Sequence, residues 1–98
     1  MIAAAWTGKK DVIRYLLKNG ANVNQHDKFR WTALIAAVNG GHRETVEFLI
    51  SNGADINAVG EDGSALRRAI EKNNAEMVNL LLKHGAIDRY GFQAVNSK

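Results

Sequence analysis

The sequence repeats itself with a period of about 33 residues, and no other feature constrains the fold as strongly. Glycine-alanine pairs begin at Gly20, Gly53 and Gly85, so the intervals are 33 and 32 residues. A shift of 33 residues also aligns Asn-Gly-Ala-Asn-Val-Asn at 19–24 with Asn-Gly-Ala-Asp-Ile-Asn at 52–57. A fixed period of this length is typical of stacked structural units, so the chain is predicted to form an array.

Each unit is predicted to contain two short helices. In the second unit Val46, Leu49 and Ile50 have the spacing of one apolar helical stripe. The repeated glycine follows the last turn of this helix, where a left-handed residue commonly ends it. Thr32 and Ser64 precede the first helices of their units and suit the N-cap position. The stripe of the first unit is Val12, Ile13, Leu16 and Leu17, and a shared slot beside the stripes holds Tyr15, Phe48 and Leu80.

Several motifs of the second unit resemble the ankyrin repeat. They are Thr-Ala-Leu-Ile-Ala-Ala at 32–37, Gly-His at 41–42 and Asn-Gly-Ala-Asp-Ile-Asn at 52–57. The family signature begins Thr-Pro-Leu-His, so Ala33 and Ile35 replace its proline and histidine, and we expect some loss of stability. The resemblance covers nearly the whole chain. It implies an all-α fold, a short α-solenoid of stacked ankyrin-type helix pairs joined by hairpin loops.

The 98 residues are predicted to form a single ankyrin repeat domain. Residues from Asp88 to Val95 parallel those from Asp27 to Leu34, which suggests the start of a further unit. The chain is then either a piece of a longer array or a protein with spare end caps. The predicted units are a truncated first repeat at 1–24, a second at 25–57, a third at 58–88 with a loop one residue shorter, and a partial fourth repeat or C-terminal cap at 89–98.

Residues that carry enzyme chemistry are scarce. The chain has no cysteine, which excludes a disulfide framework, a thiolate zinc site and a cysteine nucleophile. His26, His42 and His84 lack the spacing of metal ligands, and the resemblance implies that His42 serves the fold. Glu61 and Asp62 between two glycines favour a hairpin turn over a phosphate loop. We therefore expect no catalytic residue, no metal site and no cofactor, and the chain is predicted not to be an enzyme.

Charge and hydropathy argue against two other classes of partner. The longest apolar run, residues 1–6, is too short to cross a bilayer or to form a signal peptide. Lys10, Arg14 and Lys18 share a helical face, but Glu44 and Glu47 put acids on the equivalent helix of the next unit. A solvated face is therefore favoured over a nucleic-acid surface. We expect no membrane and no nucleic-acid partner, and the lack of cysteine fits an intracellular, cytoplasmic location.

Aromatic residues in the predicted loops are the most informative candidates for function. Phe29 and Trp31 precede the first helix of the second unit, and Tyr90 and Phe92 occupy matching positions near the end. The resemblance implies that hairpin tips and first helices form a concave surface that binds a protein partner. Large aromatic side chains often dominate such contacts. The residues implied are Trp6, Thr7, His26, Lys28, Phe29, Trp31, Asn39, Glu61, Asp62, Glu71, Lys72, Arg89, Tyr90 and Phe92.

Other interpretations stay open at this stage. Trp31 is equally suited to partner contact and to internal packing, while Trp6 suits a plug for the truncated first unit. For Tyr90 and Phe92, packing over the C-terminal end is favoured. The leading hypothesis is a non-catalytic protein-interaction module; the alternatives are a regulatory or targeting segment of a larger enzyme and self-association through open ends of an otherwise monomeric chain. The resemblance also implies Asn24 and Asn57 as candidates for hydroxylation.

Overall fold

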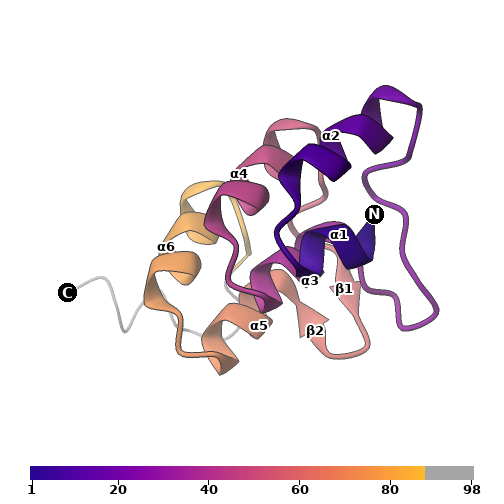
Figure 1. Cartoon of the computed structure of the whole chain (residues 1–98). Coiled ribbons are helices and arrows are strands. Elements are labelled where there is room, and N and C mark those ends of the chain that lie inside the picture. Colours follow the sequence, from indigo (N-terminus) through magenta and orange to yellow (C-terminus); the bar gives the residue numbers. More distant parts are fainter. Residues whose placement is uncertain (88–98) are drawn as a thin grey trace.

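The computed structural model describes residues 1–87 and shows three helix pairs stacked along one direction (Figure 1). This confirms the predicted helical solenoid. A two-residue antiparallel strand pair forms a hairpin in the loop before the last pair. Residues 89–98, predicted as a partial fourth repeat or cap, lie outside the described residues. The elements are α1 (Ile2–Trp6), α2 (Lys10–Lys18), α3 (Ala33–Asn39), α4 (Arg43–Ser51), β1 (Val59–Gly60), β2 (Gly63–Ser64), α5 (Ala65–Glu71) and α6 (Ala75–Lys83).

The helices form two layers. Figure 1 shows α2, α4 and α6 following one another along one side, with α1, α3 and α5 beneath them. Within the inner layer α3 contacts both α1 and α5, and each inner helix contacts its own outer partner. The hairpin of β1 and β2 extends from the inner layer, away from the outer helices (Figure 1). The end of the molecule that carries α1 therefore combines an inner helix with loop tips.

The predicted helix caps are confirmed. The Thr32 hydroxyl accepts a hydrogen bond from the amide of Ile35 at 3.3 Å, and the Ser64 hydroxyl accepts one from the amide of Arg67 at 3.2 Å. These side chains satisfy amides that have no partner within the first turn of a helix. The repeated glycines have φ angles of 91°, 91° and 99°, at Gly20, Gly53 and Gly85.

A second repeated turn brings the two helices of each pair together. Gly8 and Gly41 occupy equivalent positions with φ of 74° and 76°, and Asn73 occupies the third with φ of 56°. Glycine and asparagine are the residues that adopt this left-handed conformation most readily. Gly8 lacks a side chain for a second reason besides its φ angle, because a Cβ atom there would lie 2.6 Å from Nδ1 of His42. The turn of the first unit therefore leaves room for an imidazole from the second.

The core is a continuous seam between successive units. Small residues on the inner helices, including Ala36, Ala37 and Ala69, are fully buried, which allows the inner helices to pack closely. Val46 and Leu49 of the predicted stripe are also fully buried. Since each helix pair hides its apolar face against a neighbour, the units stabilise one another through nearest-neighbour contacts.

The first unit departs from the predicted stripe. Ile13 is buried, but Val12 is 44% exposed and Tyr15 is 67% exposed. The equivalent slot in the second unit holds Phe48, whose ring lies 5.8 Å from the ammonium of Lys10 and 5.5 Å from the guanidinium of Arg14. This slot therefore faces the preceding unit, and residues 1–87 provide no helix pair that covers α2 on that side.

Candidate functional site

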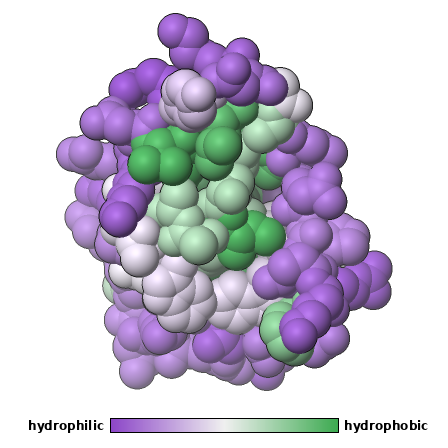
Figure 2. All heavy atoms as spheres, turned by 45° about the vertical axis from the view of Figure 1, so that its right-hand side comes forward, coloured by the Kyte–Doolittle hydropathy of each residue, from purple (hydrophilic) through white to green (hydrophobic). Residues whose placement is uncertain are grey.

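A groove of about 480 Å³ opens at the end of the stack that carries α1. It lies between α1 and the loops that precede α3 and α5. Figure 2 shows an apolar area on this side of the molecule, surrounded by hydrophilic side chains. Among the described residues, the lining consists of Ile2, Ala3, Trp6, Asp27, Phe29, Trp31 and Asp62.

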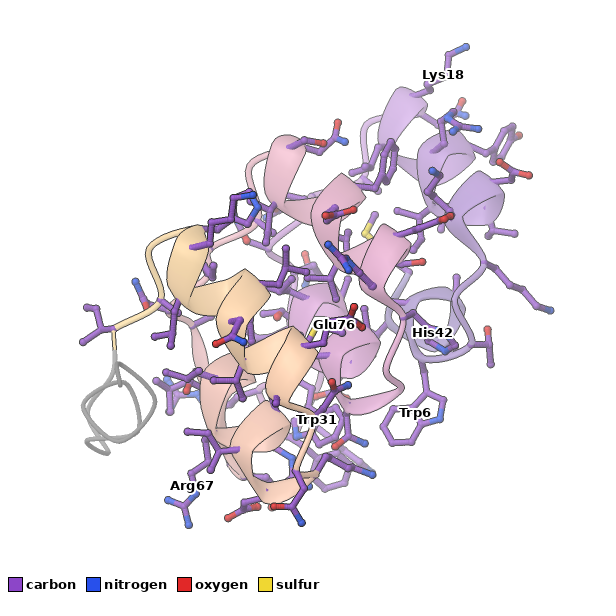
Figure 3. The ribbon with its side chains drawn as sticks, turned by 90° about the vertical axis from the view of Figure 1, so that its left-hand side faces the viewer. Trp6, Lys18, Trp31, His42, Arg67 and Glu76 are labelled. Atoms are coloured by element: carbon purple, nitrogen blue, oxygen red, sulfur yellow. The ribbon has the colours of Figure 1, made fainter. Side chains whose placement is uncertain are left out.

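A stacked pair of indole rings forms one wall of the groove. The ring centroids of Trp6 and Trp31 are 5.5 Å apart, and the ring planes differ by 24°. Trp31 is half-buried against the core, whereas Trp6 is 45% exposed. Figure 3 shows Trp6 projecting outward from the ribbon near His42. Trp31 thus packs internally, one of the two roles left open by the sequence, and it also lines the groove.

The loop before α3 is held in shape by Asp27. Its Oδ1 accepts hydrogen bonds from the amides of Phe29 at 2.9 Å and Trp31 at 3.0 Å. The amide of Asp27 donates to the carbonyl of Trp31 at 3.0 Å, which closes the turn. The carbonyl of Phe29 accepts from the amide of Glu61 at 3.0 Å, so the loop is also tied to the hairpin of the next unit. Phe29, which is 49% exposed, thus lies on a loop whose backbone is hydrogen-bonded on both sides.

The charged residues that line the groove share one sign. Asp27 and Asp62 are the charged side chains of the described lining, and both are acids. Glu61, also exposed, is adjacent in the hairpin. The ammonium of Lys28 lies 5.2 Å from the ring centroid of Phe29, on the rim. The groove is thus apolar and aromatic inside, with acids among its walls.

A comparison with models of protein families identifies the family of this chain. A model of ankyrin repeats in three copies matches residues 1–91. The chain belongs to the ankyrin repeat family. Ankyrin repeats are generally protein–protein interaction modules and are typically not enzymes. A comparison with curated proteins found no match.

Four of the predicted contact residues of this ankyrin repeat protein line the groove: Trp6, Phe29, Trp31 and Asp62. Ile2, Ala3 and Asp27 also line the groove, although they were not predicted from the sequence. A shift of 33 residues aligns Ile2 and Ala3 with Ile35 and Ala36, which are buried in the structure. In the structure Ile2 is half-buried and Ala3 is exposed, because no inner helix within residues 1–87 covers that side of α1.

Asn39 and Glu71, also predicted as contacts, belong to a polar network between the second and third repeats. Nε of Arg68 donates to Oδ1 of Asn39 at 3.2 Å, and Nη1 of Arg68 lies 2.6 Å from Oε1 of Glu71. Nε of Arg67 donates to Oε2 of Glu71 at 2.8 Å. The hydrogen bond from Arg67 is the main reason that the pKa of the Glu71 carboxyl lies below its ordinary value. Both residues are therefore engaged within the protein.

The remaining predicted contacts lie outside the groove lining. The Thr7 hydroxyl donates to the carbonyl of Ala3 at 3.1 Å, and Lys72 is exposed at the end of α5. Nδ1 of His26 lies 3.0 Å from the carbonyl oxygen of Asp27. With Lys28 and Glu61, His26 borders the loops that form the groove. Arg89, Tyr90 and Phe92 lie outside the described residues.

His42 links the first and second repeats. Its Nε2 lies 2.8 Å from the carbonyl oxygen of Trp6, and since a carbonyl only accepts, the ring donates this bond. Among residues 1–87 no group of three His, Asp or Glu side chains is placed to hold a metal ion. No helix in the same range has the length and apolar character that a bilayer crossing needs.

Proposed function

We propose that this ankyrin repeat protein binds a protein partner through the groove, with Trp6, Phe29 and Trp31 as the main contacts. The observation that carries the proposal is the stacked indole pair, which presents a half-exposed Trp6 beside an exposed Phe29. Large aromatic side chains bury much area for few rotatable bonds, which makes them efficient contact residues. A clustered apolar surface of this kind on a folded chain is typical of an interaction site.

The hydrogen bonds that hold the groove loop support the same proposal. Asp27 fixes the loop from within, and the amide of Glu61 ties Phe29 to the next hairpin. A partner that binds an ordered surface loses less conformational entropy than one that must order a loop. His26, Lys28 and Glu61 form the polar rim of the proposed surface. Thr7 and Lys72, together with Asn39 and Glu71 in their contacts with Arg68, extend it along the inner helices. Arg89, Tyr90 and Phe92 stay a prediction from the sequence.

Site-specific cross-linking tests this proposal. A photoreactive phenylalanine is placed at Phe29 in the groove and, as a control, at Tyr15, which is exposed on α2. The captured partner is identified and purified, and its affinity for wild-type protein and for the Trp6→Ala and Tyr15→Ala variants is measured. We expect capture from position 29 and an affinity at least about tenfold lower for Trp6→Ala alone. A partner captured only from position 15 and insensitive to Trp6→Ala would overturn the proposal.

Self-association is a second candidate function, because Val12 and Tyr15 are exposed where their equivalents in later repeats are covered. Light scattering at increasing protein concentration tests it. A mass that rises for wild-type protein and stays at the monomer value for Tyr15→Ser would support it, whereas a constant monomer mass would reject it. The wider alternative, a regulatory or targeting segment of a larger enzyme, stays a prediction from the sequence.

A further inference from the structure

We infer that the groove receives an arginine side chain from a basic segment of its protein partner. The inference rests on the proposed function of the groove and adds the chemistry of the occupant. Its basis is the combination of an apolar aromatic interior with charged lining residues of one sign.

Charge complementarity selects a cation. Asp27 and Asp62 are carboxylates in the lining, and Glu61 precedes Asp62 in the exposed hairpin. An acidic segment would bring like charges together and would lose hydration without compensation. A purely apolar segment would cover the carboxylates and leave their charge unpaired. A cation on an apolar stem satisfies both parts of the groove at once.

Aromatic rings in the groove favour a guanidinium. Arg side chains stack on aromatic faces through their planar, weakly hydrated head group. The chain itself provides one example, since the guanidinium of Arg14 lies 5.5 Å from the ring centroid of Phe48. The ammonium of Lys28, 5.2 Å from the ring centroid of Phe29, shows a cation on an aromatic ring of the groove itself. In the groove the methylene stem of the arginine would lie on Ile2 and Trp6.

Asp27 is well placed to receive the head group. Within residues 1–87 its carboxylate takes both of its hydrogen bonds on Oδ1, from the amides of Phe29 and Trp31. These bonds fix the orientation of the carboxylate, and neither of them uses Oδ2, the oxygen that would accept from the incoming donor. A fixed planar carboxylate matches the fork of N–H donors in arginine better than the point charge of lysine. Arginine is therefore expected to bind more tightly than lysine.

The two tryptophans of the chain give a selective readout, because both line the groove. The ¹⁵N-labelled protein is titrated with acetyl-Ser-Gly-Arg-Gly-Ser-amide and with peptides in which citrulline, lysine or leucine replaces the arginine. Citrulline keeps the shape of arginine and removes its charge. We expect the indole N–H signals to shift with the arginine peptide, and the affinity to fall about fivefold or more with citrulline. Equal affinity for the citrulline and arginine peptides would overturn the inference.

Variants locate the charge effect. Asp62→Asn removes a carboxylate at the exposed hairpin tip, and Asp27→Asn keeps an oxygen that can accept the two loop amides. Glu44→Gln, which removes an exposed acid from α4, is the matched control. We expect the affinity for the arginine peptide to fall about threefold with Asp62→Asn, to fall at least as much with Asp27→Asn, and to stay unchanged with Glu44→Gln. If Asp62→Asn and Glu44→Gln lowered the affinity equally, the effect would come from the overall charge of the protein. That result would contradict the inference.

Failure of this inference is distinguishable from failure of the proposed function. If the partner captured at position 29 docks through an acidic or apolar segment and does not respond to Asp62→Asn, the arginine is wrong and the groove is still the binding site. If the partner is captured only from position 15 and the arginine peptide leaves both indole signals unshifted, both proposals fall.

Discussion

Nε2 of His42 donates a hydrogen bond to the carbonyl oxygen of Trp6 across 2.8 Å, so one contact joins the second repeat to the groove of the first. The imidazole of His42 occupies space that a side chain at Gly8 or Gly40 would fill, because a Cβ atom at either position would approach the ring within 2.9 Å. Trp6 is thus held by its carbonyl through His42 and by its ring through Trp31. The position of the exposed indole depends on the contact between repeats.

Replacing this imidazole should weaken both folding and binding. We expect His42→Ala to lower the free energy of unfolding by about 1–2 kcal/mol, because it removes a hydrogen bond and the packing of the ring between two turns. Urea denaturation followed by circular dichroism measures the change. His84→Ala, at the exposed C-terminal end of α6, is the control and should have little effect. Equal losses in both variants would mean that the contact with Trp6 contributes nothing specific.

Asn24 should stabilise the junction between the first two repeats. Its Oδ1 accepts from the amide of Asp55 at 2.7 Å, and its Nδ2 donates to the carbonyl of Gly53 at 3.2 Å. We expect Asn24→Ala to cost about 1–2 kcal/mol of unfolding free energy and to speed hydrogen exchange of the Asp55 amide. Asn24→Asp keeps the acceptor and loses the donor, so its exchange rate at Asp55 should be closer to that of wild-type protein. Unchanged exchange in Asn24→Ala would contradict this.

Arg30 is expected to be a site where glycine stabilises the protein. Its φ of 64° lies in the left-handed region, which costs a residue with a Cβ about 1–2 kcal/mol. Glycine removes that cost but increases the entropy of the unfolded chain, so we expect a net gain of about 0.5 kcal/mol for Arg30→Gly. Asn73, with φ of 56°, tolerates this region better, and Asn73→Gly should give less. Thermal unfolding of both variants measures the two gains in stability. A larger gain for Asn73→Gly than for Arg30→Gly would contradict this prediction.

The repeat period predicted the fold because burial and backbone conformation recur with it. Thr32 and Ser64 cap equivalent helices, and Gly20 and Gly53 end equivalent ones, since the same local geometry returns in each unit. The alignment of one repeat with another does not show which helix pairs lie next to it in the stack. Ile2 aligns with the buried Ile35, yet it lines the groove.

The alignment of the repeats also could not predict which side chains pair with one another. Asn39 and Glu71 occupy the position equivalent to Trp6, and the sequence predicted all three as partner contacts. In the structure Asn39 and Glu71 are engaged by Arg68, whose long side chain reaches both. Such pairing depends on rotamers and on distances between repeats, which the spacing of residues along the chain does not determine.

Glu71 should titrate below the range of an ordinary glutamate. The hydrogen bond from Arg67 lowers the pKa of its carboxyl, with a further contribution from the charge of Arg68. A carboxyl whose pKa is lower in the folded state stabilises the protein above its unfolded pKa, and this contribution is lost as the pH falls through the folded value. NMR titration of the Glu71 side chain measures it. We expect Arg67→Ala to raise the pKa of Glu71 toward its ordinary value and Arg43→Ala, which removes ion pairs to Glu47 and Glu76, to leave it unchanged.

The two stacked tryptophans should differ in what they stabilise. Trp31 is half-buried against the core, and a Cβ atom at Gly60 would lie only 3.0 Å from its ring, so the site is closely packed. We expect Trp31→Ala to lower the free energy of unfolding by about 2–3 kcal/mol and Trp6→Ala, with a more exposed ring, by about 1 kcal/mol. Urea denaturation of both variants measures these losses. We then compare the loss of binding free energy with the loss of unfolding free energy in each variant. If both variants bind the partner at least about tenfold more weakly, the ratio of these two losses will be larger for Trp6→Ala than for Trp31→Ala. A larger stability loss at Trp6 would mean that the first repeat depends on this ring as a plug, and the groove would then be a packing feature of the end of the stack.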